Sequence, residues 1–111
     1  MQENDRVRLE HILDAISDIE SFTKEIDRER FVQDKLIRSA VVRQFEVVGE
    51  AAGNISENIQ KEFQQIPWRI IKDFRNFLIH AYFGVDYHEV FTVIETDLPI
   101  LKIKIENIIN L

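Results

Sequence analysis

Hydrophobic residues recur along this chain at intervals of three and four positions, the spacing that places side chains on one face of an α-helix. Four segments show this period, at about residues 5–22, 34–60, 67–82 and 86–109. A mostly charged stretch, K-E-I-D-R-E-R at 24–30, separates the first two segments. We find no internal repeat, low-complexity segment or interdomain linker. The pattern predicts an all-α fold, an up-and-down bundle of four to five helices, in a single domain spanning residues 1–111.

Residues that favour helix N-termini stand at the start of all four segments; they are Asn4 or Asp5, Asp34, Pro67 and Asp86. Although Gly53 is positioned to end or loosen the second helix, Ile55 and Ile59 continue its apolar period. We therefore expect that helix to reach about residue 60. Pro99 interrupts the last segment, which predicts either a kink or two separate helices.

Composition narrows the class of protein. A hydrophobic fraction of 45% excludes a disordered tail, and three glycines with two prolines are few for a β-rich fold. The absence of cysteine excludes disulfides and thiolate metal ligands. The N-terminus lacks the features of a signal peptide, and no apolar run reaches the ~18 residues of a membrane span. We expect a cytoplasmic protein that does not associate with membranes.

The net charge of −6 argues against a surface that coats nucleic acid throughout. The charge is uneven, since residues 28–75 hold 9 Lys or Arg against 7 Asp or Glu. Two interpretations fit this uneven distribution of charge. The imbalance is either ordinary variation between helix surfaces or a local basic surface around Arg69, Lys72 and Arg75 on an otherwise repulsive body.

The three histidines differ in context. His11 borders the apolar stripe of the first helix, and His88 falls in the first turn of the last helix, where we expect it to face solvent. The sequence after His88 does not complete H-E-x-x-H, and no phosphate-binding glycine loop or hydrolase G-x-S-x-G is present. We therefore expect neither a metal site nor a bound cofactor.

His80 lies in the most apolar part of the third helix, within R-N-F-L-I-H-A-Y (75–82). An apolar helix carries Arg75, Asn76, His80 and Tyr82 either as a polar network that anchors the helix or as a site. Asn76 and His80 are four apart and share a face, whereas Arg75 and His80 lie ~140° apart at ~100° per residue. They can meet if the helix ends at His80, if Arg75 reaches around, or if two chains combine.

The segment 75–82 fits the Arg-x4-His-x-Tyr signature and resembles the HepT-like toxins of the HEPN superfamily. Further segments resemble the same family in the same order, so the resemblance covers nearly the whole chain. These are D-R-V-R-L-E-H-I-L-D-A-I, V-V-R-Q-F-E-V-V-G-E-A-A, I-P-W-R and D-L-P, at 5–16, 41–52, 66–69 and 97–99.

The resemblance implies a HEPN-like bundle and a homodimeric, metal-independent ribonuclease that cleaves RNA. Such a protein is the toxin of a type VII toxin–antitoxin system whose antitoxin is a minimal nucleotidyltransferase. By position, Arg75 and His80 correspond to the catalytic pair and Asn76 to its polar companion. Tyr82 corresponds to the residue that the antitoxin modifies with AMP. Since this chain has no nucleotidyltransferase signature, the antitoxin is expected to be a separate protein.

Two further expectations accompany this hypothesis. Phe45, Phe77 and Phe83 lie beyond a single bundle stripe, which favours a homodimer; Phe45 is expected to face either another element or another chain. The alternative to a toxin is a non-catalytic helical adaptor that binds a nucleotidyltransferase or a nucleotide. In that case the polar motif serves the contact with the partner.

Overall fold

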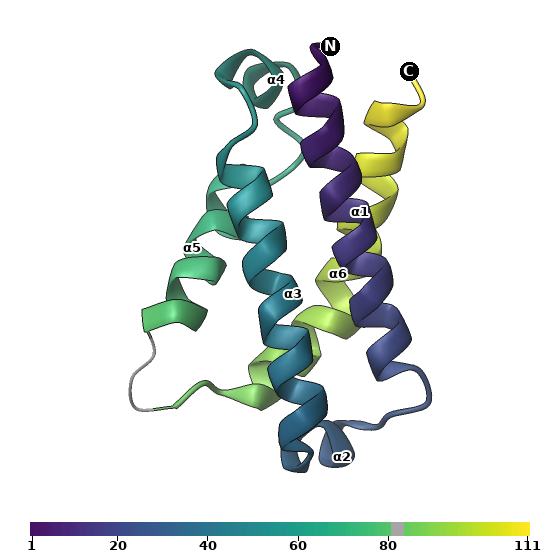
Figure 1. Cartoon of the computed structure of the whole chain (residues 1–111), viewed down its shortest axis with the longest axis vertical. Coiled ribbons are helices and arrows are strands. Elements are labelled where there is room, and N and C mark those ends of the chain that lie inside the picture. Colours follow the sequence, from purple (N-terminus) through teal and green to yellow (C-terminus); the bar gives the residue numbers. More distant parts are fainter. Residues whose placement is uncertain (81–83) are drawn as a thin grey trace.

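The computed structural model describes residues 1–80 and 84–111, and for His80 the backbone alone. The described residues form no strand. Four long helices run alternately up and down: α1 (Glu3–Thr23), α3 (Lys35–Gly53), α5 (Trp68–His80) and α6 (Tyr87–Ile109) (Figure 1). Two short helices, α2 (Arg28–Gln33) and α4 (Glu57–Glu62), lie at opposite ends of the bundle. The all-α bundle is confirmed, with six described helices instead of four to five.

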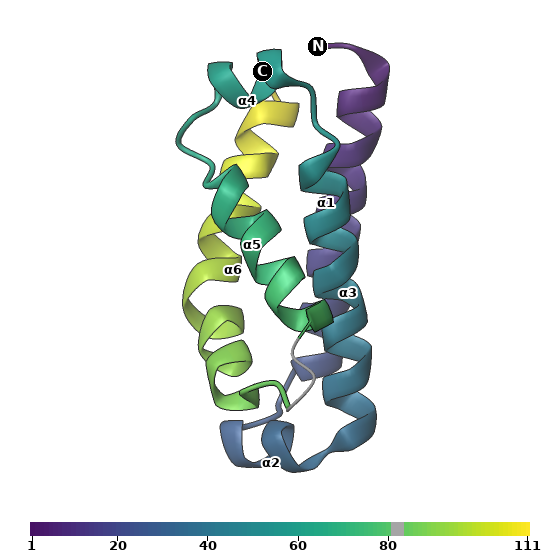
Figure 2. The same cartoon turned by 90° about the vertical axis from the view of Figure 1, so that its left-hand side faces the viewer.

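Packing follows the predicted apolar stripes. In α1, Leu9, Ile12, Ile16 and Ile19 are fully buried. Helix α3 packs against both α1 and α5, and α6 packs against α1 and α2. Seen from the side, α5 lies between α3 and α6 (Figure 2). None of the described helices combines the length and apolar character needed to cross a membrane.

Helix α2 was not predicted, because its charged sequence contains too few apolar positions to show a period. Asp27 caps it by accepting a hydrogen bond from the Arg30 N–H at 2.8 Å. Its apolar anchor is Phe31, which is fully buried and packs against the Phe91 ring at 5.4 Å between centroids. A single large aromatic side chain therefore fixes this short helix to α6.

The second predicted helix ends earlier than expected. Helix α3 stops at Gly53, and α4 begins only at Glu57, so the prediction of a helix to about residue 60 was wrong. The Asn54 side chain donates to the Glu50 carbonyl at 3.0 Å and so satisfies one of the last carbonyls of α3. Ile55 and Ile59 are buried, as their spacing indicated, but Ile55 reaches the core from the turn after α3 and Ile59 from α4.

Asp5 serves a different helix from the one predicted. Helix α1 begins at Glu3, and the Asp5 side chain is only 4% exposed. Its carboxylate accepts hydrogen bonds from the backbone N–H of Ser56 at 2.9 Å and from the Ser56 hydroxyl at 2.7 Å. Since Ser56 is the N-cap of α4, Asp5 ties that short helix to α1.

The remaining helix boundaries lie close to those predicted from the sequence. Asp34 and Asp86 cap α3 and α6 by accepting backbone N–H hydrogen bonds, as predicted. Pro67 immediately precedes α5, and its carbonyl accepts the bond from the Ile71 N–H at 3.0 Å. Helix α6 continues through Pro99, so the alternative of two separate helices is wrong.

We predict that Asp5→Ala lowers the free energy of unfolding by about 1–3 kcal/mol, because Ser56 loses both hydrogen-bond acceptors that the buried Asp5 carboxylate supplies. Urea denaturation measures this change. Asp18→Ala is the matched control, since Asp18 is an exposed carboxylate on the same helix. Equal effects of the two substitutions would show that the Asp5–Ser56 contact does not stabilise the fold.

Candidate functional site

Helix α5 carries the predicted site and is held mainly by α3. The rings of Phe45 on α3 and Phe74 on α5 meet edge to face, with centroids 5.2 Å apart. Phe45 is 4% exposed, so it faces another element of its own chain, and it is not available to a second copy. Phe77 keeps 46% of its surface exposed, and Phe83 lies outside the described residues.

Arg75 is half-buried, and its aliphatic stem passes directly over α3. A Cβ atom built on Gly49 would lie 2.6 Å from Arg75 Cγ and closer still to Arg75 Cβ. The two helices therefore approach at a point where α3 has no side chain. Sequence reasoning did not single out Gly49, although a glycine inside a helical period is a recognised sign of close packing.

The Arg75 guanidinium makes few hydrogen bonds and no ion pair with the described residues, although it is charged and half-buried. Its Nε is buried and has no hydrogen-bond partner among the described residues, and Nη1 donates to Asn76 Oδ1 at a long 3.4 Å. No described carboxylate forms an ion pair with Arg75. By contrast, exposed Arg69 pairs with Asp73 at 4.0 Å. Arg75 thus retains donors and charge for an anion, the ligand that a planar guanidinium suits best.

The bond to Asn76 bears on how Arg75 could reach His80. Helix α5 is regular across positions 75–80, so Asn76 and His80 stand one turn apart. The Arg75 guanidinium contacts Asn76 at 3.4 Å, and the side chain of His80 lies outside the described residues. The three routes by which Arg75 and His80 could meet therefore stay predictions.

The other half of the predicted site is not described. The His80 side chain lies outside the described part of the structure, as does all of Tyr82. The pairing of Arg75 with His80 and the modification of Tyr82 therefore stay predictions. The structure does place Arg75 and Asn76 together.

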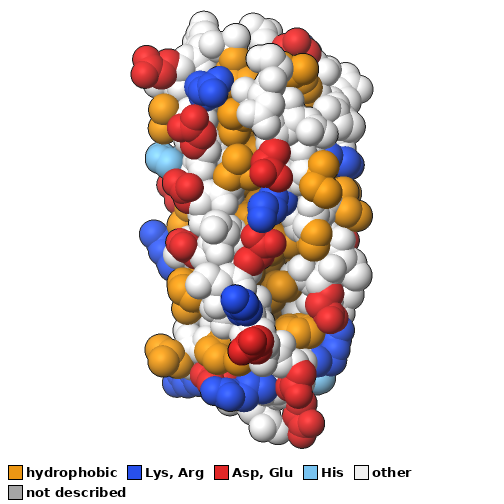
Figure 3. Space-filling model, turned by 90° about the vertical axis from the view of Figure 1, so that its right-hand side faces the viewer, with side chains coloured by type: hydrophobic (Ala, Val, Ile, Leu, Met, Phe, Trp, Pro, Cys, Tyr) orange, Lys and Arg blue, Asp and Glu red, His pale blue; other side chains and the backbone are white. Residues whose placement is uncertain are grey.

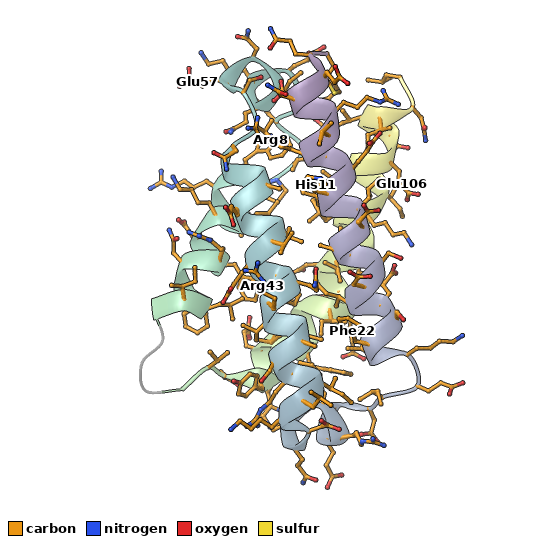
Figure 4. The ribbon with its side chains drawn as sticks, in the orientation of Figure 1. Arg8, His11, Phe22, Arg43, Glu57 and Glu106 are labelled. Carbon is orange, nitrogen blue, oxygen red and sulfur yellow. The ribbon has the colours of Figure 1, made fainter. Side chains whose placement is uncertain are left out.

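The remaining histidines stand apart from this site. His11 is exposed on α1 (Figure 4), and α3 separates α1 from α5 in the view of Figure 1. His88 is exposed in the first turn of α6, as expected. Among the side chains of residues 1–79 and 84–111, no three His, Asp or Glu group closely enough to hold a metal ion.

Charges on the α1 and α6 side of the molecule alternate in sign. Figure 3 shows basic and acidic side chains interspersed over most of that face, with several basic side chains gathered along its lower edge. Part of this alternation consists of ion pairs, such as Lys102 with Glu20 at 2.9 Å and Arg6 with Glu10 at 3.4 Å. The hydrogen bond and charge of Glu20 raise the pKa of Lys102 above its ordinary value.

An apolar groove of about 430 Å³ lies between α3, α5 and α6. Its floor includes Phe45 and Phe74, and its rims include Ile70 of α5 and Ile100 of α6. These two rim residues are 68% and 55% exposed. The groove thus leaves a sizeable apolar surface uncovered in a single chain.

Comparison with known proteins identifies the family. Residues 12–108 match the family described as ribonuclease HepT-like, and the chain therefore belongs to that family. A Thermococcus cleftensis protein named "Probable ribonuclease HepT" is 42% identical over 108 residues, which cover 97% of this chain and 98% of the relative. A Methanocaldococcus jannaschii protein provisionally named an RNase is 39% identical over 95 residues, covering 86% and 87%. No solved structure matches the chain significantly.

Proposed function

We propose that this protein is a metal-independent endoribonuclease that acts as a type VII toxin. The observation that carries the proposal is Arg75: a half-buried guanidinium without a carboxylate partner among the described residues, on a helix with the Arg-x4-His-x-Tyr motif. Membership of the ribonuclease HepT-like family supports RNA as the substrate.

The proposed reaction uses the ribose 2′-hydroxyl as nucleophile. His80 accepts the 2′-OH proton, the 2′-oxygen attacks the adjacent phosphorus, and the bond from phosphorus to the 5′-oxygen breaks. The leaving 5′-oxygen takes up a proton, so the products carry a 2′,3′-cyclic phosphate and a 5′-hydroxyl. Arg75 holds two phosphate oxygens and stabilises their increasing charge, and Asn76 orients the Arg75 guanidinium.

We further propose that the active form is a homodimer. Among the ten large hydrophobic side chains described as exposed, five belong to α5 and α6: Ile70, Phe77, Ile79, Ile100 and Ile103. Pairing through the groove between these helices would cover its exposed rim residues Ile70 and Ile100. It would also bring two copies of α5 into one assembly, in which two Arg75–His80 pairs can act on one phosphate.

The proposed antitoxin is a separate minimal nucleotidyltransferase that uses ATP. The Tyr82 hydroxyl oxygen attacks the α-phosphorus of ATP, pyrophosphate leaves, and the hydroxyl proton is released. The product is AMP joined to Tyr82 through a phosphodiester. This group adds bulk and negative charge seven residues from Arg75 in sequence, where it can occupy the phosphate site and repel RNA.

We predict that His80→Ala lowers the rate of RNA cleavage by a factor of about 10²–10⁴, the usual contribution of a proton-transfer group. Arg75→Lys should lose about 10²-fold or more, because an ammonium group cannot reproduce two-point phosphate contact. Cleavage of labelled RNA in EDTA, with the ends analysed for cyclic phosphate, measures both.

The matched control for Arg75→Lys is Arg69→Lys, an exposed arginine on the same helix that should keep wild-type activity. Near-normal cleavage by His80→Ala would show that His80 is structural. An unmodified wild-type protein that leaves RNA intact would favour the adaptor, whose polar motif binds a nucleotidyltransferase or a nucleotide.

We predict that co-expression with the partner nucleotidyltransferase attaches AMP to Tyr82 and abolishes cleavage. Peptide mass mapping locates the modification. Tyr87→Phe is the control, because the only other tyrosine packs half-buried between Phe31 and Arg38 and should not react. AMP on another residue would refute the mechanism. Inactivation of Tyr82→Phe without modification would show that the partner blocks the site by binding alone.

We predict a homodimer at micromolar concentration, with twice the 13.2 kDa mass of the chain in light scattering. Ile100→Glu should yield a monomer, since a carboxylate in the groove opposes an apolar interface. Val7→Glu, at an exposed position on α1, should leave the dimer intact. A wild-type monomer would exclude the composite site.

A further inference from the structure

Gly49 is a poor helix-forming residue in the interior of α3. It is buried inside the helix, four residues before its C-terminal residue Gly53. Glycine in a helix interior is less favourable than alanine, because it has more backbone freedom to lose. The neighbouring Ala51 and Ala52 show that small side chains with a Cβ fit elsewhere in this turn. Gly49 therefore meets a requirement that alanine would not.

The requirement comes from the Arg75 side chain. The space that a Cβ of residue 49 would take is already filled by the Arg75 stem, whose Cγ and Cδ would lie 2.6 and 3.3 Å away. Its Cβ would be nearer still. These are carbons at the root of the side chain, so they cannot swing aside as the end of a flexible chain can. Another rotamer of Arg75 would move Cγ and Cδ but not Cβ, so relief also requires that α3 and α5 move apart.

Moving the helices apart displaces the Arg75 side chain from its present place against α3. The Phe45–Phe74 ring contact lies one turn from Gly49 and next to Arg75, and it fixes the separation of α3 and α5 there. The stem path over Gly49 leads to the buried Nε and to the contact between Nη1 and Asn76. A different path would carry the guanidinium away from Asn76.

We propose that Gly49 is a positioning residue for Arg75: the missing side chain on α3 is what directs the guanidinium toward Asn76 and the scissile phosphate. This inference rests on the proposed ribonuclease function. Gly49 itself touches no substrate and acts only through Arg75.

The test compares Gly49→Ala with Gly53→Ala in the full-length chain. Gly53 lies in the same helix, and a Cβ added there would meet nothing within 4 Å. RNA cleavage is measured well below the unfolding temperature of each variant and normalised to the folded fraction. We expect Gly49→Ala to reduce kcat/KM at least tenfold and Gly53→Ala to remain within twofold of wild type.

A second pair of variants separates positioning from general stability. In an Arg75→Gly background, which lacks the Cβ and Cγ that residue 49 would strike, adding Gly49→Ala should change the residual cleavage by less than twofold, because both the clash and the group it displaces are already gone. A residue that only supports the fold would give the same loss in both backgrounds. Equal losses, or wild-type cleavage by Gly49→Ala, would overturn the inference while leaving the proposed ribonuclease intact.

The inference can still be tested if Gly49→Ala fails to fold. Arg75→Gly removes the Cβ and Cγ atoms that residue 49 would strike, so Gly49→Ala/Arg75→Gly should fold with the urea midpoint of Arg75→Gly alone. An equal midpoint shift for Gly49→Ala in both backgrounds would overturn the inference. Wild-type protein without any cleavage would instead refute the proposed function, and the positioning role with it.

Discussion

The close approach of α3 and α5 is the constraint on which the site depends. Helix α5 packs mainly on α3 and leaves much of its own surface exposed, so this one contact determines where its side chains lie. Phe45 and Phe74 supply the apolar part of the contact, and Gly49 lets the stem of Arg75 fit between the helices. Trp68 adds an anchor at the start of α5, where its indole N–H donates to the Phe63 carbonyl at 3.1 Å.

The same contact gives Arg75 its electrostatic character. A guanidinium pressed against a helix loses hydration on one side, and a cation in that setting normally gains a carboxylate partner. This chain contains 20 Asp and Glu residues, yet none of the described ones pairs with Arg75. An unpaired, partly desolvated arginine in an acidic protein is an arrangement that an anionic ligand would stabilise. Under the proposed function, that ligand is a phosphate of the RNA or of the AMP on Tyr82.

Much of the scaffold follows from local sequence. Long stripes such as Leu9 to Ile19 and capping residues such as Asp34 and Asp86 act within one helix, so period and capping chemistry locate them. The predictions were wrong or missing where the role of a residue depends on a partner far away in the sequence. Asp5 resembles a cap for α1 but binds Ser56, 51 positions away, and Phe31 becomes an anchor only because Phe91 lies opposite. The site shows the same division: the motif at 75–82 is visible in the sequence, whereas the contact between Gly49 and Arg75 requires two helices placed together.

Under the proposed function, the net negative charge of the chain and the position of Arg75 would explain why a single modification suffices to stop cleavage. Affinity for nucleic acid usually accumulates over many phosphate contacts, each of which releases counterions. A body with a net charge of −6 has few such contacts to offer. Under the proposed function, binding and catalysis therefore depend on the same small group of donors around Arg75. Under the same proposal, one AMP group that occupies these donors would cost the protein nearly all of its interaction with the scissile phosphate, without any need to unfold or rearrange the bundle.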